Sequence, residues 1–253
     1  MKRLILIALV AAGCTGAPPV DESEESVTTR KGLDYSFARP SASGLHSQGY
    51  TFAARYLSYD NSGTHGKILF AAEAKTLIAN GIDIVSNWEY ASDDALSGYN
   101  QGVADAKLAN QQAAAAGAPA DRPIYFSVDF DATPAQQTPI NAYFDGVASV
   151  IGLNRTGAYG GYYVIKRLFD ANKIKWGWQT YAWSGGQWDP RAQLRQQEVA
   201  GLFEAGRNPA VHPDSCDFVV FASLRRADQG RWHGHASGNP LTTIRHSCGG
   251  RNA

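Results

Sequence analysis

The chain has no excess of charge of either sign, since 23 Lys and Arg residues balance 23 Asp and Glu residues among 253. Proteins that bind nucleic acid usually carry a basic stripe, so we expect no nucleic-acid partner. The glycine-rich fingerprint of dinucleotide-binding folds is missing, and so is the G-x-S-x-G elbow of hydrolases with a serine nucleophile. The composition is 44% hydrophobic and 11% aromatic, which indicates a globular protein with a sizeable core.

Cysteine is scarce, and the first of the three cysteines ends a leader-like N-terminus. A basic dipeptide precedes an apolar stretch, residues 4–12, that is too short to span a bilayer. The "AAGC" that ends at Cys14 resembles a bacterial lipoprotein signal. We therefore expect residues 1–13 to be a signal peptide, Cys14 to be lipidated, and residues 14–31 to form a flexible tether. The protein would be exported to the cell envelope and held at the membrane by its lipid alone; the alternative is simple secretion.

The other two cysteines, Cys216 and Cys248, are more often paired than free in an exported chain. A bridge would close a loop of about 30 residues, contribute about 3–4 kcal/mol and tie the tail 224–253 to the body. Two free thiols are the alternative. His233 and His235 could bind a metal, but zinc needs three or four ligands and no third candidate is near in sequence. We expect no cofactor and no metal.

Short β-like runs alternate with helical segments between residues 32 and 223. The runs are 32–36, 51–59, 82–90, 123–131, 156–164, 175–183, 192–199 and 216–222. The helical segments are 68–81, 98–117, 133–152 and 163–172, and none follows the sixth run. Strands that alternate with helices form parallel βα units, and eight units close into a barrel. The sequence predicts an α/β fold, a (β/α)₈ TIM-type barrel with irregular later helices, in preference to an open doubly wound sheet.

Carboxylates lie at or near the ends of several runs: Asp34, Glu89, Asp129, Asp131 and Asp217. In "YFSVDFD" the last two acids are two positions apart, so on a strand they would share one face about 7 Å apart. If the polar faces all point inward, the five acids converge on one barrel mouth, with Arg55 nearby. Burying a carboxylate costs several kcal/mol unless it is paired or protonated. Structural ion pairs and hydrogen bonds could account for one or two of these acids, but not readily for all five. The pattern therefore indicates an acidic site.

Five fragments carry a resemblance to a known family: "GLDYS", "NWEY", "YFSVDFD", "GAYGGYYV" and "CDF". Together they resemble the glycoside-hydrolase-like domain of unknown function number 1906, which is related to the family 25 glycoside hydrolases, barrel lysozymes that cleave peptidoglycan. The resemblance covers about Gly32 to Ser223. It implies that Asp34 matches the Asp ending the first strand, and that Asp129 and Asp131 match a D-x-E element, with Asp131 in place of the general-acid Glu.

The resemblance implies a glycoside hydrolase acting on cell-wall polysaccharide, most simply peptidoglycan. Asp131 or Glu89 would be the acid, Asp129 the stabiliser or base, and Asp34 would position the sugar or an attacking water. Because Asp is one methylene shorter than Glu, a catalytically silent carbohydrate-binding lipoprotein is the alternative. A hydrolase that depends on Mg²⁺ or Ca²⁺ bound at the acidic mouth is a third hypothesis.

Aromatic and polar residues near the run ends are candidates for contact with the polysaccharide. Tyr and Trp offer flat apolar faces with a polar edge, although many such residues serve only in core packing. Gln196 is included because it matches a glutamine late in the family's barrel. The substrate-binding candidates are Arg55, Trp88, Tyr90, Tyr159, Trp183, Gln196 and Asp217.

Overall fold

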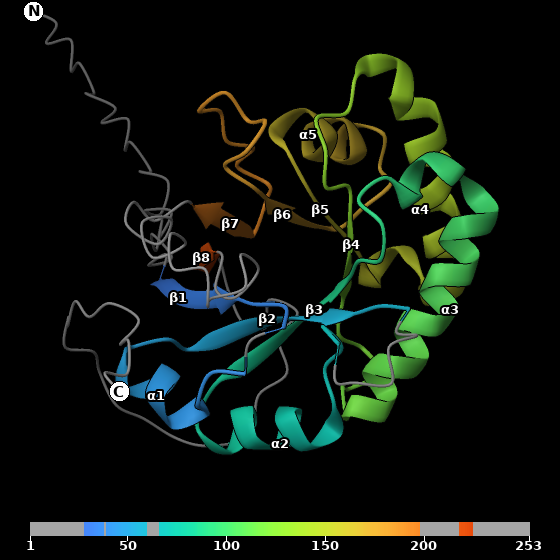
Figure 1. Ribbon diagram of the computed structural model, residues 1–253. Helices are drawn as coiled ribbons and strands as arrows, with labels where there is room; N and C mark the ends of the chain where they lie inside the picture. Colours follow the sequence, from blue (N-terminus) through green and yellow to red (C-terminus); the bar gives the residue numbers. More distant parts are fainter. Residues whose placement is uncertain (1–27, 38, 60–65, 198–217, 225–253) are drawn as a thin grey trace, which may run out of the picture.

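The computed structural model describes residues 28–37, 39–59, 66–197 and 218–224, which form a curled sheet with helices along its outer side (Figure 1). Seven strands are parallel and pair in chain order. They are β1 (Thr28–Asp34), β2 (Phe52–Leu57), β3 (Asp83–Trp88), β4 (Ile124–Ser127), β5 (Thr156–Gly160), β6 (Trp176–Gln179) and β7 (Leu194–Gln197). The eighth strand, β8 (Phe218–Leu224), runs antiparallel to both β7 and β1.

Five helices follow the first five strands. They are α1 (Ala42–Ser47), α2 (Ala71–Ala79), α3 (Tyr99–Ala116), α4 (Gln137–Ile151) and α5 (Tyr162–Asp170). Single 3₁₀ turns occur at Asp94–Ser97, Pro134–Gln136 and Leu153–Arg155. No helix joins β6 to β7, as the sequence predicted. The short helix α1 was not predicted; Ser41 caps it by accepting a hydrogen bond from the Gly44 amide at 3.3 Å.

Each of the eight predicted runs contains a strand, although several strands are shorter than predicted and residues 162–164 of the fifth run belong to α5; the α/β class is confirmed. The sheet departs from a regular (β/α)₈ barrel because β8 is antiparallel to both of its neighbours. Apolar alternation identifies a strand but carries no information about its direction. The first strand also begins at Thr28 rather than at Gly32, so the end of the predicted tether belongs to the sheet.

Both faces of the sheet are buried, as is usual for parallel strands with helices on the outside. The inner face carries an apolar cluster with one or two residues from each of β2 to β7: Phe52, Ala54, Val85, Tyr125, Tyr159, Trp178 and Leu194. Gly32 on β1 makes room for it, since a Cβ there would lie 2.2 Å from a Phe52 ring carbon. The outer face packs against the helices in two further clusters. Alternate strand residues therefore belong to different cores.

Helices α3 and α4 cross at two glycines. A Cβ on Gly102 would lie 2.0 Å from the Tyr143 carbonyl oxygen, and one on Gly146 would lie 2.1 Å from the Tyr99 carbonyl oxygen. The two backbones are therefore in direct contact, with no space for a side chain at either crossing point.

We expect Gly102→Ala to lower the free energy of unfolding by about 1–3 kcal/mol, because overpacking outweighs the better helix propensity of alanine. Denaturant unfolding measures the change. The matched control is Gly44→Ala in α1, where the nearest atom to a new Cβ is the Ser41 Cβ at 3.5 Å. That variant should be neutral or slightly more stable, and equal effects of the two substitutions would contradict the close crossing.

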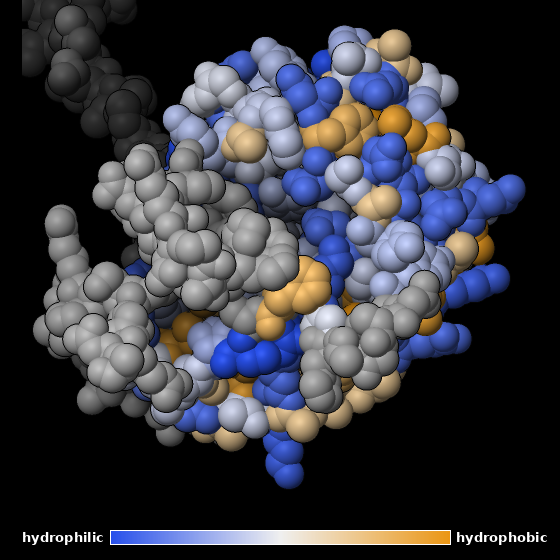
Figure 2. Space-filling view, in the orientation of Figure 1, coloured by the Kyte–Doolittle hydropathy of each residue, from blue (hydrophilic) through white to orange (hydrophobic). Residues whose placement is uncertain are grey.

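The surface of the described residues in Figure 2 is mostly hydrophilic, with smaller hydrophobic patches between the polar side chains. Among the residues that the structure describes, no helix is long and apolar enough to cross a membrane.

Candidate active site

A polar layer lies above the inner apolar cluster, at the carboxyl ends of the strands. Asp34, the last residue of β1, is 3% exposed and accepts hydrogen bonds from Gln196 Nε2 at 3.0 Å and from the Tyr56 hydroxyl at 3.3 Å. The Tyr159 hydroxyl donates to Gln196 Oε1 at 2.7 Å. The Asn87 amide donates to Ser127 Oγ at 2.9 Å. Hydrogen bonds from β2 and β7, and through Gln196 from β5, therefore fix the Asp34 carboxylate at the end of β1, and a separate bond joins β3 to β4.

Glu89 lies one residue past the end of β3, and its amide still donates to the Leu57 carbonyl on β2 at 3.0 Å. Its carboxylate forms an ion pair with Lys67, with Nζ and Oε1 2.9 Å apart. The two side chains are only 18% and 17% exposed, so solvent screens the pair less than a surface pair. The Lys67 ammonium also lies 5.1 Å from the centre of the Tyr56 ring.

Asp129 lies two residues past the end of β4 and is half-buried. Its amide donates to the Ser92 carbonyl at 3.1 Å, and the preceding Val128 amide donates to the Tyr159 carbonyl at 2.9 Å. Burial, followed by the negative charge of Glu89, raises the pKa of the Asp129 carboxyl to about 6. The nearby Tyr159 hydroxyl and the charge of Lys67 act in the opposite direction.

Two buried phenols lie near the three carboxyl groups and feel their charges. Burial raises the pKa of Tyr159 well above its usual value, and the charges of Asp129, Asp34 and Glu89 add to the effect. Burial and the charges of Asp34 and Glu89 do the same to the pKa of Tyr56. Both phenols therefore stay neutral donors at physiological pH. Asp34, Glu89 and Asp129 are brought together, as the sequence predicted.

Asp131 does not share this environment. Strand β4 ends at Ser127, so the alternation that placed Asp131 beside Asp129 does not continue to residue 131. Asp131 is exposed to solvent, whereas Asp129 is partly buried. The predicted pairing of the two aspartates on one strand face is therefore corrected.

Arg55 and Trp88 were predicted to contact substrate, but both lie on the outer face of the sheet. Arg55 is fully buried and pairs with Glu73 of α2, with Nε and Oε1 2.7 Å apart. Trp88 is 1% exposed and packs edge-on against the Tyr59 ring at 5.0 Å, within the core beneath α3 and α4. Their inward neighbours in the chain are Tyr56 and Asn87, which do belong to the polar layer.

The remaining aromatic candidates differ in exposure. Tyr159 is buried in the polar layer, while Tyr90 and Trp183 are 52% and 38% exposed. The Tyr90 ring packs edge-on against the Tyr59 ring at 5.2 Å. Trp183 has a positive φ of 56°, a conformation uncommon for residues other than glycine. Both exposed rings remain substrate-binding predictions.

Several predicted residues lie outside the described part of the chain: Cys14, Cys216, Asp217 and Cys248. Within the described residues, no group of three or more His, Cys, Asp or Glu side chains could hold a metal ion.

Sequence reasoning missed Lys67 and Tyr56. Tyr56 could have been found, because the alternation that identified Asp34 and Glu89 also applies to β2. Lys67 precedes α2 in the connection from β2 and carries no motif, so no sequence pattern marked it.

The family model of the Rv2525c-like, glycoside hydrolase-like domain matches residues 43–217. A Mycobacterium tuberculosis protein named "Putative peptidoglycan hydrolase Rv2525c" is 34% identical over 176 residues, covering 66% of this chain and 73% of the relative. The fold is that of a glycoside-hydrolase-like α/β protein. The chain belongs to the Rv2525c-like family, which confirms the family resemblance seen in the sequence.

Solved structures agree with this membership. The crystal structure of the M. tuberculosis Tat-secreted protein Rv2525c in complex with L-tartrate has a TM-score of 0.68 and 30% identity, and the match covers 82% of this chain and 100% of that chain. A muramidase from Trichobolus zukalii has a TM-score of 0.51 at 15% identity, with 78% of this chain and 94% of that chain covered. At that identity the likeness concerns the fold alone.

Proposed function

We propose that this protein is a glycoside hydrolase that cleaves cell-wall polysaccharide, with peptidoglycan as its substrate. The observation that carries the proposal is the partly buried Asp129 carboxyl near a Glu89 carboxylate that is paired with Lys67, an environment that raises the pKa of Asp129 to about 6. Glycoside hydrolysis needs one carboxyl that holds a proton and a second that is ionised, and unequal environments provide this difference.

In this assignment Asp129 is the general acid. Its proton passes to the glycosidic oxygen as the bond from that oxygen to the anomeric carbon breaks. Glu89 is the ionised partner, which either takes a proton from the attacking water or attacks the anomeric carbon itself; the stereochemistry of the product distinguishes these courses. Asp34, held by Tyr56 and Gln196, orients the sugar or the water. The sequence instead suggested Asp131 or Glu89 as the acid and Asp129 as the stabiliser or base, so this proposal moves the acid role to Asp129.

The choice of peptidoglycan is supported by the name of the M. tuberculosis relative, a peptidoglycan hydrolase. Export is supported by the leader-like N-terminus and by the description of that relative's crystal structure as a Tat-secreted protein. Lipid attachment at Cys14 and a bridge between Cys216 and Cys248 complete the proposal. Labelling with a fatty acid, which Cys14→Ala should abolish, tests the anchor.

The direct test of function is the release of reducing ends from purified peptidoglycan, followed as a function of pH. Because the acid must be protonated, kcat/KM should fall about tenfold per pH unit above pH 6, where Asp129 loses its proton. A rate that instead rises through pH 6 to a plateau would contradict the assignment of Asp129 as the acid. Binding to peptidoglycan without release at any pH would favour the catalytically silent binder.

A further inference from the structure

Lys67 reaches the site from a connection that has no regular structure of its own. Residues 66–70 lie between β2 and α2, where a single bridge pairs Ile68 with Tyr56 and the Leu69 amide donates to the Tyr56 carbonyl at 2.8 Å. A lysine has a flexible four-carbon stem, so its ammonium is well placed only if its backbone is fixed.

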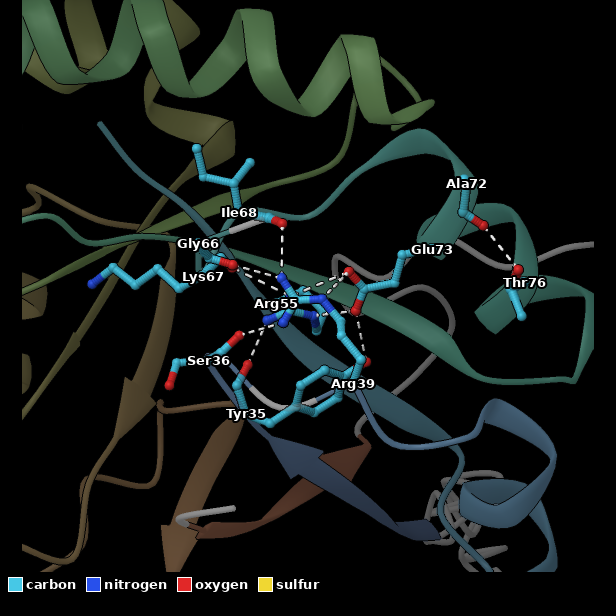
Figure 3. Close-up of polar contacts among 10 residues, drawn as sticks. All are labelled: Tyr35, Ser36, Arg39, Arg55, Gly66, Lys67, Ile68, Ala72, Glu73 and Thr76. Carbon is cyan, nitrogen blue, oxygen red and sulfur yellow. Dashed lines mark hydrogen bonds and ion pairs between the residues drawn. The ribbon is translucent and has the colours of Figure 1, made fainter. Parts of the chain in front are cut away.

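Two arginines on the outer side of the sheet supply donors to three consecutive carbonyl groups of this connection (Figure 3). Arg39 Nη2 donates to the carbonyl oxygens of Gly66 at 2.7 Å and Ile68 at 3.3 Å. Arg55 Nη2 donates to the Lys67 carbonyl oxygen at 3.2 Å. The backbone on both sides of the lysine is therefore held by guanidinium groups, and Figure 3 shows the Lys67 side chain directed away from them.

The two arginines are themselves fixed by Glu73 of α2. Its carboxylate lies 3.2 Å from Arg39 Nε and 2.7 Å from Arg55 Nε. Arg55 also donates to the Tyr35 carbonyl and lies 4.3 Å from the centre of the Tyr35 ring, while Arg39 donates to the Ser36 carbonyl at 2.7 Å. The three charged residues Arg39, Arg55 and Glu73, here called the arginine cluster, thus connect the end of β1, β2 and α2 to the Lys67 connection.

We propose that the arginine cluster is a positioning device for the active site, which acts through Lys67 to hold a positive charge against Glu89. None of its three side chains belongs to the polar layer around the carboxylates. Its consequence for turnover rests on the proposed function, but its effect on the charges of the site does not. A planar guanidinium has five N–H donors in a fixed, spread geometry, so it can hold carbonyls and a carboxylate on different sides, whereas the three donors of a lysine ammonium leave one nitrogen atom.

The carboxyl group of Asp129 can report the position of the Lys67 charge, because the Lys67 charge acts on its pKa. Glu89 raises the pKa of Asp129, whereas Tyr159 and Lys67 lower it. Lys67 faces Glu89 and the Tyr56 ring, and its charge also lowers the pKa of Asp94 in the turn after β3. Loss of the lysine charge, or its displacement from Glu89, should therefore raise the pKa of Asp129.

The test is a double-mutant cycle read by carboxyl ¹³C NMR titration of Asp129 in the full-length chain. Lys67→Gln should raise its pKa by about 0.5–1 unit. Arg39→Ala should raise it in the same direction by at least about a third of that amount, although Arg39 is outside the polar layer. In the Lys67→Gln background, Arg39→Ala should add less than about 0.2 unit, because its effect passes through the lysine.

Arg191→Ala is the matched control, since Arg191 is also a partly exposed arginine that holds a loop, through Asp189 and Asp170. It should leave the Asp129 titration unchanged. If Arg39→Ala fails to fold, Arg39→Lys takes its place. Lysine keeps the positive charge next to Glu73 but lacks the planar guanidinium donors, so this variant should also raise the pKa of Asp129.

An Asp129 titration that is unchanged by folded Arg39 variants would overturn the proposal, and so would an equal shift with and without Lys67. The readout needs no turnover. If the cycle shows the expected coupling but the protein releases no reducing ends, the proposed enzymatic function is refuted and the positioning role stands. If the protein releases reducing ends but the cycle shows no coupling, the positioning role is refuted and the enzymatic function stands.

Discussion

Asp129→Asn is expected to lower the rate of reducing-end release from peptidoglycan by about 10²–10⁴-fold. Asparagine has nearly the same shape and removes the proton that the leaving oxygen requires, so the loss should appear in kcat more than in binding. The fold should survive, because Asp129 lies beyond the end of β4 and its backbone amide, not its side chain, donates to the Ser92 carbonyl.

Two variants sharpen this experiment. Asp145→Asn changes a half-exposed carboxylate of α4 that pairs with Lys173, and it should leave the rate unchanged. Asp131→Asn separates the structural assignment from the one suggested by sequence. Because Asp131 is exposed, its loss should change the rate by less than about threefold, an effect too small for a general acid. Full activity in Asp129→Asn, with loss in Asp131→Asn, would restore the sequence-based assignment.

Arg55→Met is expected to lower the free energy of unfolding by about 3–5 kcal/mol. The substitution keeps much of the volume of the side chain but removes the fully buried partner of Glu73. The Tyr35 and Lys67 carbonyls also lose a donor, and Glu73 keeps only its contact with Arg39 among the basic groups that pair with it in the described residues.

Denaturant unfolding measures the loss, with Lys173→Met as the control. Lys173 is paired with Asp145 on the surface of the molecule, and exposed pairs contribute about 0–1 kcal/mol. A loss below about 1 kcal/mol for Arg55→Met would mean that α2 and the sheet are held together mainly by apolar packing, and would remove the structural basis of the arginine cluster.

The sequence predicted the strands well, because the buried strands have distinctive composition and are separated by turns or helices. It also predicted that Asp34, Glu89 and Asp129 would meet, since each lies at or just past the carboxyl end of its strand. This follows from parallel pairing, which brings those ends to one edge of a sheet.

Alternation failed where the two faces of a strand are both buried. On β2 and β3 the inner and outer residues are similarly apolar, so the pattern identifies two faces without saying which is internal. Arg55 and Trp88 were therefore assigned to the site although they lie on the helix side. The prediction for Asp131 was wrong for another reason. Strand β4 ends at Ser127, so the alternation of side chains between two faces cannot be extended to residue 131.

The basic residue of the site was beyond reach for sequence reasoning. Lys67 is next to Glu89 in space but 22 positions away in the chain, and its backbone is held by Arg55 of β2 and by Arg39 in the loop after β1. The place of Lys67 in the site therefore depends on tertiary contacts, and no fixed separation between residues in the sequence indicates it.

The central claim is that Asp129, next to the ion pair of Glu89 and Lys67, keeps its proton up to a pH of about 6. Carboxyl ¹³C NMR titration of Asp129 in the wild-type protein tests this claim most directly. We predict a pKa of about 6, and a lower pKa in Glu89→Gln, because the negative charge of Glu89 contributes to the shift. A titration near the ordinary aspartate value of about 3.9, unaffected by Glu89→Gln, would contradict the proposed acid and its ionised partner.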